Sequence, residues 1–181
     1  MEENELIAID VKNFSQYVLN KKIAFGLSNK EFGEKVGLSE GEISKIINRK
    51  RLSVSLHSFY AISVKTGDTI EQTRDFVYPH RNFDLKIIKD QIDTNRTRKG
   101  FGIFMQDNYE TDTKDNVQGK NAFEIILAKT GISKQRLTDI YFGTGAPEPY
   151  ELLLIEKAVG KNTGEMMKEY ITMYPNKKKG E

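Results

Sequence analysis

The amino-acid sequence predicts a mainly α-helical protein built from two related helical domains. In the first half, Ser or Thr followed three residues later by Glu or Gln recurs at short intervals, which is the pattern of helix starts. The apolar residues after these starts have the spacing of one helix face. A similar order of glycine, serine and apolar residues returns in the second half. A chain of 181 residues has room for one large domain or two small ones.

Five short helices are expected, in order, between residues 8 and 79. The first starts near residue 10, and the next four start at Ser28, Ser39, Ser55 and Thr69. The side chains expected to face the core are apolar and follow helical spacing: Val11, Phe14, Val18, Phe32, Val36, Ile43, Ile46, Ile47, Phe59, Ile62, Ile70, Phe76 and Val77.

The second and third helices are expected to cross at a steep angle. Each begins with a capping box, in which Ser28 pairs with Glu31 and Ser39 pairs with Glu42. Only three residues, starting with Gly37, separate the two helices. A short connection that contains glycine is typical of two helices packed as a corner.

A degenerate second copy of this pattern is expected in residues 121–175. Thr130-Gly131-Ile132-Ser133 repeats Val36-Gly37-Leu38-Ser39, and Leu137 and Ile140 follow at the positions of Ile43 and Ile46. Asn121 with Glu124 starts a helix before this turn, and both copies close on a Tyr-Pro pair. We interpret the agreement as a tandem repeat.

Between the two copies, residues 80–120 are expected to form a linker region. Leu85, Ile88 and Ile92 have helical spacing and offer a substitute for the first helix that the second copy lacks. The apolar side chains of Phe101, Ile103 and Met105 alternate along the chain, which indicates a short strand or hairpin.

Several classes of chemistry are not expected. The chain has no cysteine and only two histidines, His57 and His80, which are far apart, so we expect no metal site. No phosphate-binding or dinucleotide-binding glycine motif is complete, and we expect neither a cofactor nor catalysis. No long apolar stretch and no signal-peptide pattern is present, so a cytoplasmic protein without a membrane span is expected.

Basic residues are clustered, although the net charge is only +2. No acidic residue lies between Glu42 and Asp68, a stretch that contains Lys45, Arg49, Lys50, Arg51 and Lys65. A second stretch without acids lies between Asp93 and Asp107. Local positive patches attract polyanions even when the whole chain is nearly neutral.

These motifs resemble the Cro/lambda-repressor-like (XRE-type) helix-turn-helix family. The resemblance covers roughly residues 10–77 and is weaker in residues 121–172. It is carried by Gly26-Leu27-Ser28, Phe32, Val36-Gly37-Leu38-Ser39, Ile43-Ser44-Lys45-Ile46, Arg49 and Ser55-Leu56. It implies a five-helix DNA-binding domain in residues 8–79 and a degenerate helix-turn-helix-like domain in residues 121–175. The closing Lys177-Lys178-Lys179 separately indicate a basic tail in residues 176–181. The chain departs from the family at Asn29, where Gln is frequent, and at Gly41.

The resemblance also implies which residues contact DNA. The recognition helix, near residues 39–48, would lie in the major groove. Base edges would be read by Ser39, Glu40, Ser44 and Lys45, whereas Asn29, Lys30, Asn48, Arg49, Lys50 and Arg51 would bind phosphates. Lys134, Gln135 and Thr138 form a second candidate contact, although the second copy lacks a basic loop.

The function expected from the resemblance is that of a sequence-specific transcriptional regulator, such as a repressor, of bacterial or bacteriophage type. It would bind double-stranded DNA, as a homodimer on a palindromic site. For the second copy, a structural or dimerising role is favoured over independent DNA binding. The alternative is an antitoxin-like interaction module whose C-terminal half binds a partner protein.

Overall fold

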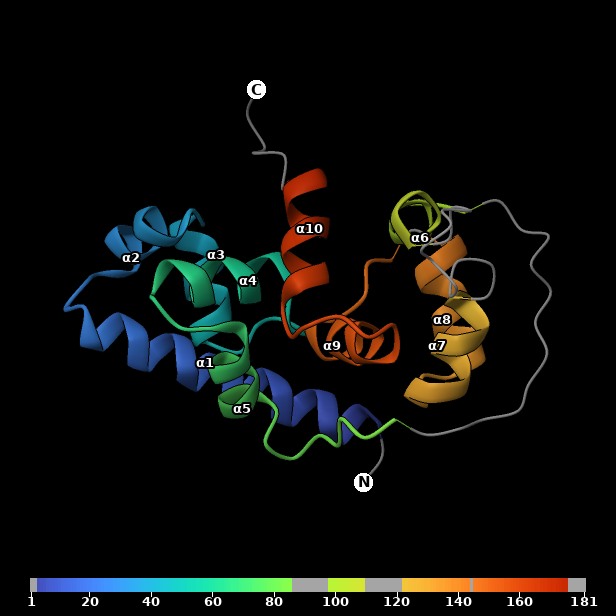
Figure 1. Cartoon of the computed structure of the whole chain (residues 1–181). Helices are drawn as coiled ribbons and strands as arrows, with labels where there is room; N and C mark the ends of the chain where they lie inside the picture. Colours follow the sequence, from blue (N-terminus) through green and yellow to red (C-terminus); the bar gives the residue numbers. More distant parts are fainter. Residues whose placement is uncertain (1–2, 86–97, 110–121, 144, 176–181) are drawn as a thin grey trace. The chain divides into compact units, whose positions relative to one another are not determined.

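The chain is mainly α-helical, as predicted, and its described part contains no strand (Figure 1). The structure is a computed structural model that describes residues 3–85, 98–109, 122–143 and 145–175. It divides into two units. The N-terminal unit contains Met1–Asn82 with Glu148–Tyr150, and the C-terminal unit contains Phe83–Pro147 with Glu151–Glu181.

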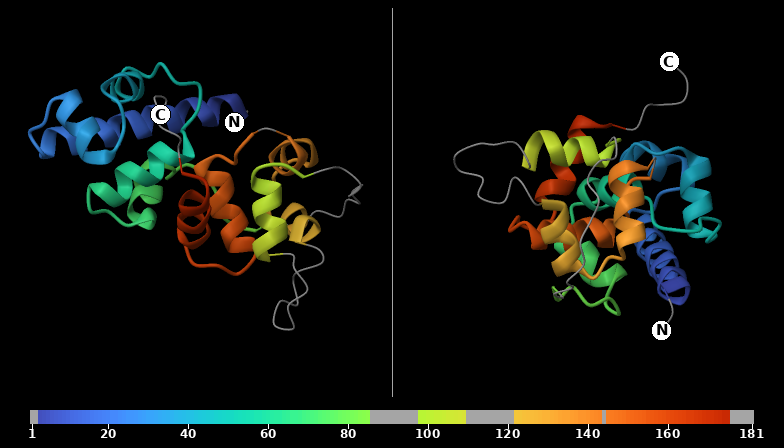
Figure 2. Two further views of the ribbon diagram at one scale, coloured as in Figure 1. Left: turned by 90° about the horizontal axis from the view of Figure 1, so that it is seen from above. Right: turned by 90° about the vertical axis from the view of Figure 1, so that its right-hand side faces the viewer.

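Five helices form the N-terminal unit. They are α1 (Glu3–Ala24), α2 (Asn29–Val36), α3 (Glu40–Ile47), α4 (Leu56–Lys65) and α5 (Ile70–Val77). Helix α1 is the longest, and α3 and α5 pack along it (Figures 1 and 2). It begins at Glu3, earlier than predicted. Arg81 pairs with Glu3 at 2.8 Å and with the buried Asp10 at 2.6 Å, so one guanidinium holds the first two turns of α1 to the segment after α5.

The predicted helix starts are present. Capping boxes close at Ser28 with Glu31, at Ser39 with Glu42 and at Thr69 with Gln72. The Ser55 side chain caps α4 by accepting from the backbone N–H of Ser58. Each side chain satisfies a backbone donor that would otherwise have no partner within its helix.

The core of the N-terminal unit follows the predicted pattern with three exceptions. Fully buried members include Val18, Phe32, Ile43, Phe59, Ile62 and Val77. Val11 and Ile47 are only half-buried, and the expectation that Phe76 faces the core is wrong, because it is 44% exposed. In α5 the inward stripe is Ile70, Thr73 and Val77, so Phe76 lies at its flank with its ring 5.6 Å from the Tyr17 ring.

The C-terminal unit contains α6 (Phe101–Tyr109), α7 (Ala122–Thr130), α8 (Lys134–Phe142), α9 (Pro149–Ala158) and α10 (Glu165–Met173). The expectation of a strand or hairpin near Phe101 is wrong. Phe101, Phe104 and Met105 are fully buried at helical spacing, and α6 packs on α8. Residues 101–109, expected to lie in a linker, therefore form a core helix. The predicted helical segment at Ile88 and Ile92, the helix start at Asn121 and the basic tail lie outside the described residues.

The two units share local backbone features at the positions that correspond in the proposed sequence repeat. Gly37 and Gly131 both have left-handed backbone, with φ of 77° and 71°, and Ser39 and Ser133 both cap the helix that follows. They differ in how closely the flanking helices approach, because Gly33 of α2 corresponds to Leu127 of α7. A leucine side chain does not fit into the space that Gly33 leaves.

Candidate nucleic-acid interface

The corner between α2 and α3 is tight because two glycines permit it. Gly37 adopts φ of 77°, a left-handed conformation that glycine adopts without a steric penalty, and ends α2. The Leu38 N–H then donates to the Gly33 carbonyl at 2.9 Å. A Cβ on Gly33 would lie 2.7 Å from the Leu38 carbonyl oxygen, so no larger residue fits there without a backbone shift. The direction of α3 is therefore fixed relative to α2.

The predicted recognition helix, α3, buries one face and exposes the other. Ile43 and Ile46 are 0% and 6% exposed and anchor it to the core. Its far end is held by Ser15 of α1, whose hydroxyl donates to the Ile47 carbonyl at 2.8 Å. The opposite face carries side chains that are exposed or, for Ser44, half-buried: Ser39, Glu40, Ser44, Lys45 and Asn48.

Three of these predicted contact residues also stabilise the ends of α3. The Ser39 Oγ accepts from the Glu42 N–H at 3.2 Å. Asn48 Nδ2 donates to the Ser44 carbonyl at 2.9 Å and to the Ser44 hydroxyl at 3.2 Å. Within the described part of the chain, no hydrogen bond or ion pair engages the side chains of Glu40 and Lys45. Both are available to a ligand on this face.

The loop after α3 presents the basic run as three exposed residues, Arg49, Lys50 and Arg51. Arg49 has φ of 54°, which is uncommon for a residue other than glycine. Its N–H donates to the Ile46 carbonyl at 3.0 Å, and the Lys50 N–H donates to the Lys45 carbonyl at 2.8 Å. The chain thus folds back on the end of α3 and keeps three cations next to it.

Arg51 is tied to α3 by Glu42, a residue that the sequence analysis did not place in the site. The Glu42 carboxylate lies 3.5 Å from the Arg51 guanidinium and also accepts from the Ser39 N–H. Because this pair is exposed, it contributes little to stability, but it orients the loop. The pairing was not evident in the sequence because the two residues belong to different elements.

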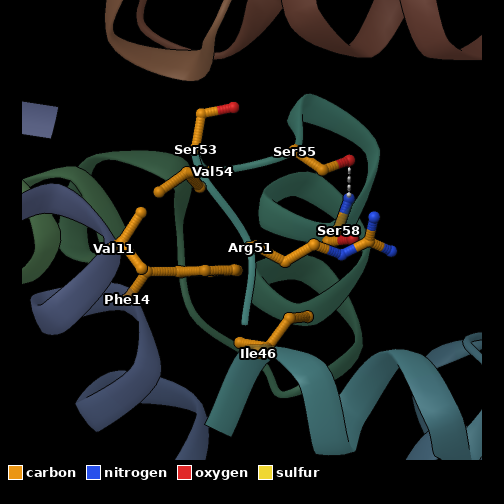
Figure 3. A pocket seen from close by; sticks show the side chains of 8 residues that line it. All are labelled: Val11, Phe14, Ile46, Arg51, Ser53, Val54, Ser55 and Ser58. Atoms are coloured by element: carbon orange, nitrogen blue, oxygen red, sulfur yellow. Dashed lines mark hydrogen bonds between the residues drawn. The ribbon is translucent and has the colours of Figure 1, made fainter. Parts of the chain in front are cut away.

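A small depression lies beside this loop, as Figure 3 shows. It is lined by Val11, Phe14, Ile46, Arg51, Ser53, Val54, Ser55 and Ser58. Its volume of about 10 Å³ is close to what a single water molecule needs, which is too small for a metabolite. The Arg51 side chain runs away from Val11 and ends beside Ser58 of α4 (Figure 3).

The start of α2 brings a further cation to the site. Asn29, a predicted phosphate contact, is half-buried, and its Oδ1 accepts from Lys22 Nζ of α1 at 2.9 Å. Lys30 is exposed. Sequence spacing could not reveal Lys22, because a turn separates it from Asn29. The pKa of the Glu31 carboxyl is lowered by hydrogen bonds from Ser28, so this acid stays ionised and directed at the Ser28 N–H.

The corresponding helix of the C-terminal unit, α8, has fewer free polar groups. Gln135 donates to Asp139 at 3.2 Å, and the Thr138 hydroxyl donates to the Lys134 carbonyl at 2.7 Å. Arg136 donates two hydrogen bonds of 2.7 Å each to the buried Glu151. Its charge is therefore neutralised within the unit.

The histidines and the acidic residues of the described ranges were the remaining candidates for metal ligands. The two histidines are partly buried, and His80 Nε2 lies 2.9 Å from the Asp10 carboxylate. Across residues 3–85, 98–109, 122–143 and 145–175, no three His, Asp or Glu side chains are grouped as metal ligands. In the same ranges no helix has the length and apolar character that crossing a bilayer requires.

A comparison of the chain with protein-family models, with curated proteins and with solved structures found no match.

Proposed function

We propose that this protein is a sequence-specific DNA-binding transcriptional regulator with a Cro/lambda-repressor-like helix-turn-helix domain. One observation carries the proposal. Helix α3 is held by a glycine corner with Ile43 and Ile46 inward, and its outer face runs directly into an exposed loop of three cations. This combination matches the docking of a recognition helix in the major groove, with neighbouring cations on the phosphates.

The proposed contacts divide into base readout and phosphate binding. Lys45 is suited to guanine O6 and N7, and Glu40 is suited to the amino group of cytosine. Each good base contact contributes roughly 1–3 kcal/mol of discrimination. Arg49, Lys50 and Lys30 are exposed and suited to phosphates, which would make the affinity strongly dependent on salt.

We assign a different role to the C-terminal unit. Its helix α8 lacks a basic loop, and its Arg136 is already paired with Glu151. Without cations for phosphates, a unit loses most of its sequence-independent affinity. We therefore propose that this unit serves dimerisation, which would place two α3 helices on a palindromic site. Light scattering of the full chain should show a dimer, and a monomer in the presence of its DNA site would contradict this part of the proposal.

The experiment that tests DNA binding is selection of duplexes from a random pool at fixed salt, followed by affinity measurements over a range of salt concentrations. The triple variant Lys45→Ala, Arg49→Ala and Lys50→Ala should lose binding to the selected duplex. The charge-matched control changes three exposed lysines on other helices to alanine: Lys12, Lys157 and Lys168. The proposal would be refuted if the selection enriched no DNA sequence, or if the two triple variants lost affinity for the selected duplex equally.

A further inference from the structure

Leu52, in the loop between α3 and α4, is the most exposed large apolar side chain among the described residues. It is 95% exposed, and the next, Ile23, is 65% exposed. A single exposed apolar residue is common on a protein surface and needs no function. Leu52 differs from such cases in its surroundings, since it directly follows Arg49, Lys50 and Arg51.

The loop is held on both sides of Leu52. Before it, the backbone folds onto the end of α3 through the Lys50 N–H bond to the Lys45 carbonyl at 2.8 Å, and Arg51 pairs with Glu42 of α3 at 3.5 Å. After it, Val54 is only 3% exposed and points toward Val11 of α1 (Figure 3). The Lys50 N–H bond and the buried Val54 therefore hold the backbone on both sides of Leu52, and Leu52 lies in the segment that follows α3.

We propose that Leu52 contacts an apolar part of DNA at the edge of the site, either a thymine methyl group or the carbons of a deoxyribose. This inference rests on the proposed DNA-binding function. Charge complementarity selects the partner, because three consecutive exposed cations beside Leu52 attract a polyanion. Thymine methyl groups and sugar carbons are the apolar surfaces that such a polyanion offers to a side chain.

The contact has a signature that separates it from the phosphate contacts. Leu52→Ala removes apolar surface and no charge, so binding to the selected duplex should weaken about tenfold with an unchanged salt dependence. Lys50→Ala should instead reduce the slope of log K against log salt by about 0.9. Because Leu52 is 95% exposed, the variant should fold with an unchanged midpoint of thermal unfolding.

The test measures wild type, Leu52→Ala and the control Val64→Ala, which shortens an apolar side chain of α4 that is 46% exposed. Each is titrated with the selected duplex and with a duplex in which uracil replaces thymine. If the contact is a methyl group, the uracil duplex weakens wild type but not Leu52→Ala. If the contact is a sugar, Leu52→Ala is weaker on both duplexes by the same factor.

Three outcomes would overturn the inference. In the first, Leu52→Ala binds both duplexes as tightly as wild type while Lys50→Ala binds more weakly. This result would show that Leu52 does not contact DNA, although the protein binds DNA, and Leu52 would then be available to a protein partner. In the second, selection from the random pool enriches no sequence for the wild-type protein. This result would refute both the proposed DNA-binding function and the Leu52 contact. A loss in Val64→Ala equal to that in Leu52→Ala would show that the effect is not local.

Discussion

Replacing Arg49 with glycine should stabilise the fold and weaken DNA binding at the same time. Arg49 has φ of 54°, in the left-handed region. A residue with a Cβ in this region costs roughly 1–2 kcal/mol, whereas glycine adopts it without that penalty. Glycine also has a more flexible unfolded state, which offsets roughly 0.5–1 kcal/mol of the gain. The net stabilisation expected for Arg49→Gly is therefore about 0.5–1 kcal/mol.

The same change removes one guanidinium from the loop that we propose binds phosphates. If Arg49 contacts one phosphate, the slope of log K against log salt should become shallower by about 0.9. Arg49→Ala is the matched control, because it also removes the guanidinium but keeps a Cβ at the left-handed position. Alanine should therefore show the shallower slope without the gain in stability.

Urea unfolding measures the stability and fluorescence anisotropy with the selected duplex measures the slope. In thermal unfolding, a stabilisation of this size raises the Tm of a small domain by about 2–8 °C. Arg49→Gly with lower stability than wild type would refute the argument from backbone strain. A salt slope equal to that of wild type would show that Arg49 touches no phosphate, whatever its effect on stability.

Three further changes have expected outcomes. Gly33→Leu introduces a Cβ that would lie 2.7 Å from the Leu38 carbonyl oxygen, so unfolding should become easier by roughly 1–3 kcal/mol; the control Gly41→Ala, whose nearest atom is 4.0 Å away, should instead stabilise α3 by about 1 kcal/mol in urea unfolding. Ser15→Ala removes the donor to the Ile47 carbonyl and should cost about 1 kcal/mol, and an unchanged urea midpoint would contradict this anchor. Burial raises the pKa of the Glu156 carboxyl from 4.5 to about 7, so the folded state binds its proton more tightly than the unfolded state does; this contribution, about 3 kcal/mol, should be present below pH 4.5 and be lost as the pH rises to about 7. Glu156→Gln should remove that pH dependence from thermal unfolding of the C-terminal unit, and a wild-type pH profile would refute the assignment.

The helix starts could be predicted from sequence because they depend on neighbours three residues apart. Ser28 with Glu31 and Thr69 with Gln72 form their capping boxes as expected. Within α3, the inward and outward positions also follow from spacing, apart from Ile47 at the edge of the buried stripe. Such local patterns are independent of the rest of the fold.

Contacts between distant residues could not be predicted in this way. Glu42 meets Arg51, and Lys22 meets Asn29, only because turns return the chain to the same place. The segment near Phe101 was misread for a related reason. Its short apolar run fits both a strand and a helix, and the packing of α6 on α8 decides between them.

The difference between the two units can be traced to one position of the repeated pattern. In α2, Gly33 leaves space for the Leu38 carbonyl, and the corner closes tightly enough to direct α3. In α7 the corresponding residue is Leu127, which is buried, and the Ile132 N–H donates to the Thr130 hydroxyl at 3.2 Å, whereas the corresponding Leu38 N–H donates to the Gly33 carbonyl. The close glycine contact of the C-terminal unit lies elsewhere, between Gly102 of α6 and the Tyr141 backbone of α8. Similar helix starts therefore give similar local structure in both units, whereas the Gly33 corner, on which the proposed role of α3 as a recognition helix rests, is found in the N-terminal unit.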